Sequence, residues 1–246
     1  EPRKSGNKSL YQNMGWHYRR LVVPRILPQC RKIITVSHFE RNRIREALRL
    51  PDGQITTVYN GYSRHFYPQE DPSPITRKYI EESRYLFFLG NTDPKKNVPR
   101  TLKAYSLYRE KSPKPLPLLI ADIKEEILGS ILREQGIEHV RPHIVCPGYI
   151  PNTDLPYLYS GAFAFLYTSL RESFGIPLLE AMACGTPVVT SNTSSMPEVG
   201  GPGALLCDPT DAKDIAHKIL SLEKDPALYR QQIQYGLRRA TVSYTH

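Results

Sequence analysis

Short apolar runs alternate with longer amphipathic stretches over most of this 246-residue chain. From residue 85 onward, five apolar runs of strand length are separated by segments with the spacing of helices. We expect strands at 85–89, 116–121, 143–146, 162–167 and 187–190, and helices at 98–110, 124–135, 154–160, 177–183, 212–222 and 226–240. Strands that alternate with helices predict an α/β fold with a parallel, doubly wound sheet. Because ligands of such sheets bind beyond the carboxyl ends of the strands, we look for chemistry in those loops.

A smaller group of elements is expected before this region. Residues 32–36 and 55–58 have the composition of short buried strands, and the segment 39–50 between them has helical spacing. Ser37 and Glu40 have the spacing of a capping box, in which each side chain satisfies a free backbone N–H at the start of a helix. The order is therefore strand, cap, helix and strand.

Proline and glycine mark the limits of this smaller group. The aromatic and aliphatic pattern of residues 11–29 is interrupted by two prolines, which predicts a kinked helix. The pair Asn60-Gly61 is a turn or hinge signal, and the proline-rich, charged stretch 68–84 predicts a linker with one or two helical turns. We therefore divide the chain into residues 1–62 and residues 63–246.

The composition indicates a folded protein and excludes several classes. A chain with 40% hydrophobic residues can bury a core, and no run approaches the roughly 18 apolar residues of a membrane-spanning helix. The first residues are polar and basic and have no apolar signal-peptide core. The four cysteines lack the paired spacing of a zinc or redox motif, so we expect buried thiols in a reducing cytoplasm.

The net charge of +9 is confined to the beginning of the chain. Residues 1–50 carry twelve Lys and Arg against three acids, which accounts for the whole excess, so the rest of the chain is neutral. This distribution argues against a nucleic-acid-binding module, in which we would expect basic residues across the domain. The basic region is either a solvated helical face or a surface that attracts anionic lipid at the inner membrane face or a phosphate-bearing acceptor, and composition does not choose between them.

The densest group of chemically suggestive residues is 171–189. A strand ends near Tyr167, a glycine-containing loop follows, and Pro177 opens a helix, so free backbone N–H groups face outward. Such helix starts attract phosphate. Glu172 and Glu180 flank this position, and because carboxylates repel phosphate, they suit the hydroxyl groups of sugars on either side of a diphosphate. Two surface carboxylates that stabilise a helix start are the simpler alternative.

With the intervening Ser-Phe-Gly-Ile-Pro, this spacing resembles the E-x7-E motif of family 4 retaining glycosyltransferases. The resemblance extends to Val36-Ser37, Asn60-Gly61, Gly148 to Pro151, residues 183–189 and residues 195–199. It implies a GT-B fold in which 63–246 is the Rossmann-like, nucleotide-sugar-binding domain and 1–62 is a truncated remnant of the acceptor domain with the hinge. The expected reaction transfers a hexose such as mannose, with retention, from a UDP- or GDP-linked donor to a glycan or lipid-linked acceptor in polysaccharide biosynthesis.

The resemblance also implies roles for individual residues of this motif. Glu172 is the expected catalytic residue and contacts hydroxyls of the donor sugar near the reacting carbon. Glu180 is expected to bind the ribose. The residues between them are expected to bind the sugar and the phosphates, largely through the backbone: Ser173, Phe174, Gly175 and Ile176.

A second loop, 90–97, follows the first strand of the sheet and carries two lysines. In the similar family this loop supplies an arginine just after the glycine and a lysine near its end, and both pair with the donor diphosphate. Lys96 matches the lysine and is the second expected catalytic residue, since it would stabilise the leaving phosphate. Asn91 stands in place of the arginine, so Lys95 either supplies part of that charge or is a solvated residue of a basic turn. The other expected donor contacts are Gly90, beside the phosphates, and Tyr149, beside the nucleobase.

No cofactor and no metal are expected. The seven histidines have no metal-ligand spacing and no D-x-D motif occurs, so the lysine and the helix start would stabilise the leaving group. Three alternatives stay open: an epimerase or phosphorylase of the same architecture, a nucleic-acid-binding module, and a non-catalytic nucleotide-sugar-binding fragment. The third has weight because a GT-B enzyme needs two full domains, and only about sixty residues precede the hinge.

Overall fold

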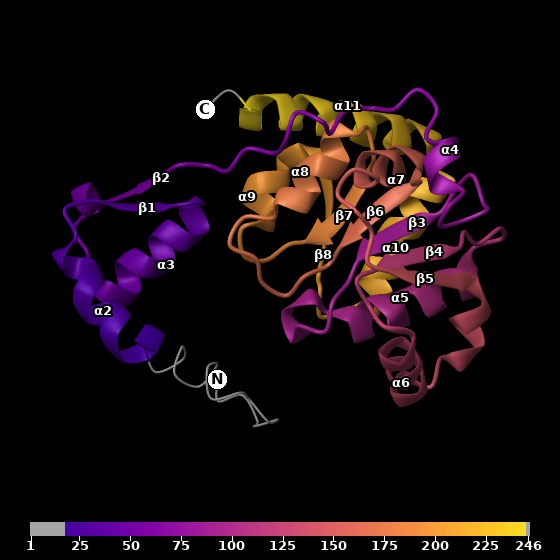
Figure 1. The fold of residues 1–246 in the computed structure, drawn as a ribbon, viewed down its shortest axis with the longest axis horizontal. Helices are drawn as coiled ribbons and strands as arrows, with labels where there is room; N and C mark the ends of the chain where they lie inside the picture. The colour runs from indigo at the N-terminus through magenta and orange to yellow at the C-terminus, as the bar shows by residue number, and fades with distance from the viewer. Residues whose placement is uncertain (1–17, 245–246) are drawn as a thin grey trace. The chain divides into compact units, whose positions relative to one another are not determined.

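A computed structural model describes residues 18–244, which divide into two compact units between Val58 and Tyr59 (Figure 1). The sequence places this division after residue 62. Residues 1–17, which include the start of the predicted helix 11–29, lie outside the described part of the chain.

The first unit is built on two short parallel strands, β1 (Ile33–Thr35) and β2 (Ile55–Thr57), with Ile33 paired to Ile55. Helix α3 (His38–Leu48) connects them, and the Ser37 hydroxyl accepts a hydrogen bond from the Glu40 backbone N–H at 3.2 Å, as the capping-box spacing predicts. Ile33, Leu50 and Ile55 form its small buried core.

The described part of the predicted kinked helix changes its winding at the prolines. A π-helical turn (Tyr18–Val22) is followed by α2 (Val23–Ile26) and a 3-10 turn (Leu27–Gln29). Because proline has no backbone N–H, Pro24 and Pro28 interrupt the regular hydrogen bonding of an α-helix.

The second unit contains a six-stranded, wholly parallel sheet in the order β5-β4-β3-β6-β7-β8. Its strands are β3 (Leu86–Leu89), β4 (Leu118–Ala121), β5 (Ile144–Gly148), β6 (Ala164–Tyr167), β7 (Val188–Ser191) and β8 (Ala204–Cys207). This order is the doubly wound Rossmann order, so the predicted fold class is confirmed. Strand β8 has no predicted counterpart, because its four residues stand directly after a glycine-rich turn.

Helices cover both faces of this sheet (Figure 1). On one face α5 packs against α6 and α10, and on the other α8 packs against α7 and α11. The bounds of the helices in this unit are α4 (Ser73–Thr76), α5 (Val98–Lys111), α6 (Glu125–Gln135), α7 (Leu155–Gly161), α8 (Ile176–Ala183), α9 (Met196–Gly200), α10 (Ala212–Lys224) and α11 (Pro226–Tyr244).

Successive residues of the central strand supply the two cores. Leu86 and Phe88 belong to the cluster beneath α5, α6 and α10. Phe87 points the other way, where its ring contacts those of Tyr159 and Phe165 at centroid distances of 5.3 and 5.7 Å. A strand buried on both faces is therefore hydrophobic throughout, as parallel sheets require.

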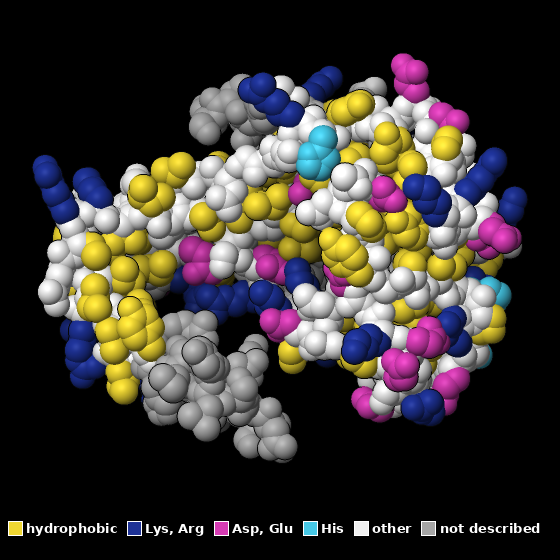
Figure 2. All heavy atoms as spheres, in the orientation of Figure 1, with side chains coloured by type: hydrophobic (Ala, Val, Ile, Leu, Met, Phe, Trp, Pro, Cys, Tyr) yellow, Lys and Arg dark blue, Asp and Glu magenta, His cyan; other side chains and the backbone are white. Residues whose placement is uncertain are grey.

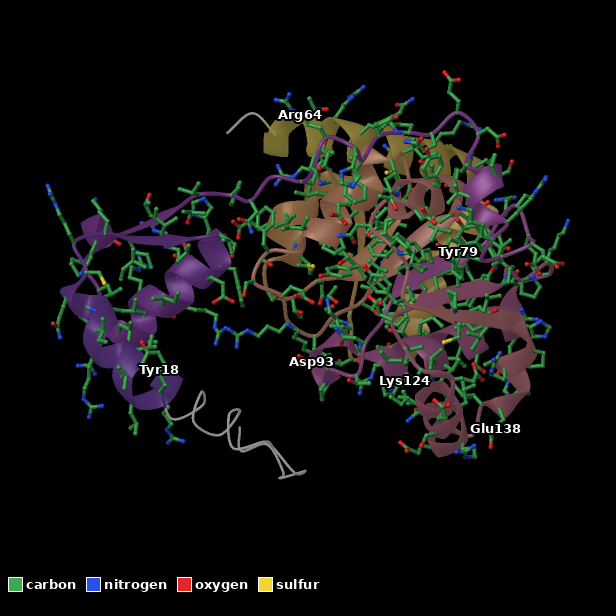
Figure 3. The ribbon with its side chains drawn as sticks, viewed as in Figure 1. Tyr18, Arg64, Tyr79, Asp93, Lys124 and Glu138 are labelled. Atoms are coloured by element: carbon green, nitrogen blue, oxygen red, sulfur yellow. The ribbon has the colours of Figure 1, made fainter. Side chains whose placement is uncertain are left out.

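The stretch predicted as a linker is instead packed on the second unit. Ile80, in the middle of this stretch, is buried, with only 2% of its surface exposed. The hydroxyl of Tyr79, labelled in Figure 3, donates to the Asp154 carboxylate at 2.7 Å. The backbone N–H of Gln69 donates to a serine hydroxyl of α7 at 3.1 Å. The helical turn predicted for this stretch is present as α4, but the stretch is held by side-chain contacts and is not a free linker, which its proline-rich composition does not reveal.

The strand order creates a switch point between β3 and β6. From β3 the chain crosses outward through β4 and β5, and from β6 it crosses in the opposite direction through β7 and β8. The loops that follow β3 and β6 therefore diverge at the carboxyl edge of the sheet, and ligands of doubly wound sheets bind in the crevice this leaves.

The close approach of α11 to the turn before β8 gives a test of the packing. A Cβ atom on Gly203 would lie 3.1 Å from the Gly236 Cα and the Tyr235 carbonyl oxygen, both rigid backbone atoms. We expect Gly203→Ala to cost about 1–3 kcal/mol of unfolding free energy and to lower the Tm by several degrees. Gly61→Ala is the control, since nothing lies within 4 Å of its Cβ position. Equal Tm values for the two variants would contradict this packing.

Candidate functional site

The loop after β3 is held in shape by its own side chains. The Asn91 side-chain oxygen accepts from the Asp93 backbone N–H at 2.9 Å, and the Asp93 carboxylate accepts from the Lys95 N–H at 3.0 Å. These two bonds lead into the 3-10 turn Pro94–Lys96. The loop, marked by Asp93 in Figure 3, thus presents Lys96 at its end in a defined position.

Asn97 then joins this loop to its neighbours across the switch point. It adopts a left-handed backbone conformation with φ 60°, which asparagine tolerates well, and its side chain is buried. Its amide donates to the Thr168 carbonyl at 3.0 Å and to the Pro209 carbonyl at 2.8 Å. The Leu170 N–H donates to the Lys95 carbonyl at 2.7 Å. The loops after β3 and β6 are therefore joined directly by two of these hydrogen bonds.

Two serines fix the loop that follows β6. The Ser194 hydroxyl accepts from the Glu172 N–H at 3.0 Å and lies 3.1 Å from the Glu172 carbonyl. The Ser195 hydroxyl lies 2.9 Å from that same carbonyl and 3.1 Å from the Phe174 carbonyl. The backbone on both sides of Ser173 is thus held by the loop after β7.

The helix after this loop begins one residue earlier than predicted. Gly175 has φ 98°, and a Cβ there would lie 2.7 Å from the Met196 methyl carbon, so only glycine fits. Helix α8 starts at Ile176, with Pro177 as its second residue. Among the described residues, the N–H groups of Gly175 and Ile176 have no hydrogen-bond acceptor. These two amides can therefore bind an anion.

Lys96 and Glu172, one from each loop, form an ion pair at the switch point. The Lys96 Nζ lies 2.8 Å from the Glu172 Oε1, and the two side chains are only 16% and 12% exposed. The same ammonium lies 3.4 Å from the Tyr167 hydroxyl and 5.0 Å from the centre of its ring. Both expected catalytic residues therefore meet on the end of β6.

Tyr167 connects this pair to the other predicted carboxylate. Its phenol is buried, which raises its pKa above the ordinary value, and the nearby charges of Glu172 and Glu180 raise it further. Because both carboxylates act on one hydroxyl, the two ends of the E-x7-E motif lie around the same ring.

Glu180 lines a cavity of 280 Å³ beside this cluster. Burial raises the pKa of Glu180 to about 7, and a weak hydrogen bond from the Tyr159 hydroxyl at 3.4 Å partly opposes that rise. The cavity lies between the loops after β4 and β5 and the start of α8. Its other lining residues are Leu89, Ala121, Asp122, Tyr149, Ile150, Asn152, Leu155, Ile176 and Pro177.

The predicted residues at the cavity and the helix start occupy different environments. Tyr149 is 74% exposed at the cavity wall, and Ile176 lines the same wall. Phe174 is buried, with its ring 5.7 Å from that of Tyr59, so only its backbone is available for a ligand. Ser173 is exposed.

The other predicted residues of the loop after β3 have different functions in the fold. Gly90 is buried and its N–H donates to the Ala121 carbonyl at 3.1 Å. The Asn91 side-chain oxygen accepts a hydrogen bond within the loop. Lys95 reaches Asp93 at 4.0 Å and is 42% exposed, which favours the solvated-turn interpretation for this lysine.

Two residues of the site are not predicted from the sequence. Asp122 lines the cavity, and Asn97 joins the neighbouring loops through its side-chain amide. Asp122 directly follows a buried strand, which is the one signal that could have marked it.

In the part of the chain from 18 to 244, no three His, Cys, Asp or Glu side chains gather as metal ligands. None of the described helices combines the length and hydropathy needed to cross a bilayer.

The surface charge of the second unit agrees with its neutral sequence. Figure 2 shows basic and acidic side chains interspersed over this unit, without a broad area of one sign in this view. A nucleic-acid-binding surface would show clustered basic residues, so the second unit does not have that character on this face.

Family models match both parts of the chain. That of the glycosyl transferases group 1 matches residues 75–239, and that of glycosyltransferase family 4 matches residues 4–66. The O-antigen chain mannosyltransferase B of Escherichia coli is 35% identical over 210 residues, covering 81% of this chain and 53% of the relative. The chain thus spans about half the length of the curated relative it matches.

Solved structures show the same fold. Sucrose-phosphate synthase from Thermosynechococcus elongatus superimposes with a TM-score of 0.77 at 24% identity, covering 93% of this chain and 58% of that one. Anabaena Alr3699/HepE, in complex with UDP and glucose, gives a TM-score of 0.76 at 18% identity, covering 91% and 62%. The fold is therefore of the GT-B type.

The raised pKa of Glu180 predicts a pH-dependent contribution to stability. Its ordinary pKa is 4.5, so between about 4.5 and about 7 the folded chain holds a proton that the unfolded chain releases. This group therefore favours the folded state less as pH rises through that window. We expect Glu180→Gln, which cannot ionise, to raise the Tm relative to wild type more at pH 8 than at pH 5.

Thermal unfolding at both pH values measures this difference. Glu126→Gln, on the exposed surface of α6, removes the same charge outside the cavity and should change the Tm equally at both pH values. If Glu180→Gln also gives the same Tm difference at pH 5 and pH 8, the pKa of Glu180 is not raised.

Proposed function

Because the chain belongs to the glycosyl transferases group 1 family, we propose that it forms the donor-binding part of a hexosyltransferase. The enzyme takes a hexose from a nucleoside diphosphate and transfers it to a glycan or lipid-linked acceptor during polysaccharide biosynthesis. The name of the 35% identical Escherichia coli relative supports mannose as the hexose. The observation that carries the proposal is the Lys96–Glu172 pair between two free amides and a carboxylate-lined cavity.

The position of Lys96 suits a residue that stabilises the leaving group. Cleavage of the anomeric C–O bond develops negative charge on the leaving phosphate and positive charge on the sugar ring. The Lys96 ammonium has three N–H donors and is held by Glu172 and Tyr167 at the end of β6. Together with the N–H groups of Gly175 and Ile176, it offers positive charge that needs no reorganisation during the reaction.

Glu172 has two functions in this proposal. It keeps Lys96 oriented, and it accepts hydrogen bonds from hydroxyls of the donor sugar near the reacting carbon. Its low exposure strengthens such bonds, because the surrounding dielectric is lower than in water. Retention of configuration follows from the resemblance to family 4, and no residue is assigned as a nucleophile.

The nucleoside occupies the cavity lined by Glu180. A ribose has two adjacent hydroxyls that can donate hydrogen bonds to the Glu180 carboxylate. Tyr149 lies on the cavity wall, where it would be beside the base. Since Asn91 is neutral and its side-chain oxygen is used in the turn, the diphosphate depends on Lys96 and the two amides. The reaction proceeds without a resident metal or cofactor in this proposal.

The acceptor and the location are inferred from the kind of reaction. Nucleotide sugars are cytoplasmic metabolites, and a lipid-linked acceptor would be met at the inner membrane face. The basic residues among the first 50 suit peripheral contact with anionic lipid there. No part of this proposal involves nucleic acid.

Binding of a nucleoside diphosphate to the 246-residue chain tests the site. We expect Lys96→Ala to weaken binding at least about tenfold, since a hydrogen bond to a charged group contributes about 1.5–3 kcal/mol. Lys95→Ala is the matched control, because it removes the same charge from the preceding residue, whose side chain is more exposed. This variant should change the Kd less than about threefold. Isothermal titration calorimetry measures both, with circular dichroism to check folding. Equal losses in the two variants would contradict the assignment of Lys96.

Transfer itself is tested in the intact enzyme that contains this chain. We expect Glu172→Ala to lower kcat by about 10²–10³, as removal of a group acting in the transition state does, while circular dichroism shows that the protein remains folded. Wild-type turnover in this variant would remove Glu172 from the reaction. Donor binding without transfer by the intact wild-type protein would favour the alternative of a non-catalytic nucleotide-sugar-binding protein.

A further inference from the structure

Asp122 places a carboxylate without a partner in the wall of the nucleoside cavity. It follows β4 directly, is exposed, and lines the cavity together with Glu180. Among the described residues no side chain or backbone group donates a hydrogen bond to its carboxylate. Partial burial raises the pKa of the Asp122 carboxyl, and no neighbouring cation opposes that rise. A ligand with hydrogen-bond donors would satisfy this group.

The backbone holds Asp122 firmly in this position. Its φ is 59°, a left-handed conformation that aspartate adopts more readily than most residues. Its N–H donates to the Gly148 carbonyl at 2.8 Å, which ties the end of β4 to the end of β5. Figure 3 labels Lys124, two residues further on, just before α6 begins. The carboxylate is thus presented by the rigid edge of the sheet.

The cavity wall favours a ligand that donates hydrogen bonds. Its two charged lining residues, Asp122 and Glu180, are both acids, and no lining residue is cationic. The phosphates must therefore lie outside it, toward Lys96. If the Glu180 carboxylate binds the ribose, the Asp122 carboxylate is the remaining acidic group of the cavity that can accept hydrogen bonds from the base.

We propose that Asp122 selects guanine as the base of the donor nucleotide. This inference rests on the proposed function, because it assumes that the cavity holds a nucleoside. The Watson–Crick edge of guanine carries two adjacent donors, the N1–H and the exocyclic amino group. A carboxylate has two acceptor oxygens at matching spacing, so the pair forms two parallel hydrogen bonds.

The other common bases do not match a carboxylate in this way. Uracil carries one N–H between two carbonyl oxygens, so a second carboxylate oxygen would face a carbonyl of like partial charge. In adenine and cytosine the amino group stands beside a ring nitrogen that is an acceptor. Each of these bases leaves one oxygen of Asp122 opposite another acceptor, and a polar group that a bound base shields from water and leaves unpaired is costly.

Calorimetric titration of the 246-residue chain with GDP, IDP and UDP tests this proposal. IDP differs from GDP only by lacking the exocyclic amino group. We expect wild type to bind GDP at least about tenfold more tightly than UDP, with IDP between them. Asp122→Asn keeps the size of the side chain and tolerates the same backbone conformation. In this variant the affinity for GDP should fall at least about tenfold, while the affinity for UDP should not fall. The advantage of GDP over IDP should disappear.

Glu126→Gln serves as the matched control, because it removes one negative charge nearby, on the exposed face of α6, and should leave all three affinities unchanged. A wild-type preference for UDP, or an unchanged ratio of GDP to UDP affinity in Asp122→Asn, overturns the selection of guanine while the proposed function stands. Failure of wild type to bind any of the three nucleotides contradicts the proposed function, and this inference falls with it.

Discussion

The adjacency of β3 and β6 is the constraint on which the site depends. Because the chain winds outward in opposite directions from these strands, their loops separate at one edge of the sheet and leave room for a ligand. The Lys96–Glu172 pair brings together one charged side chain from each of these loops at that opening. A lysine and a glutamate 76 positions apart in sequence meet only because these two strands are neighbours.

The remaining features of the site keep this opening rigid. Asn97 bonds to both flanking loops, two serines hold the backbone around Glu172, and Gly175 permits the close approach of Met196. Rigid support matters because a charge aimed at a leaving phosphate is effective only if it need not move during the reaction. In the proposed function, the free amides at the start of α8 bind the phosphates, and the cavity lined by Glu180 holds the nucleoside.

Local patterns were enough to predict most of the second unit, whereas contacts between distant segments were not. The strands from β3 to β7 follow from apolar runs, and the proposed catalytic pair follows from the resemblance to the family with the E-x7-E motif. Strand β8 gives little signal, because only four apolar residues follow a glycine-rich turn, and the proline content of residues 68–84 predicts a linker although Ile80 in that stretch is buried. Asp122 gains meaning only when β4 and β5 are known to be neighbours, since a single aspartate after a strand has no motif of its own.

In the proposed function, Lys96, Glu172 and Glu180 surround one bound nucleoside diphosphate. A crystal structure of the 246-residue chain with GDP tests this arrangement. We expect a phosphate oxygen at about 2.7–2.9 Å from the Lys96 Nζ, a second near the Ile176 N–H, and the ribose hydroxyls on Glu180. A diphosphate bound on another surface, with Lys96 touching only Glu172, would contradict it.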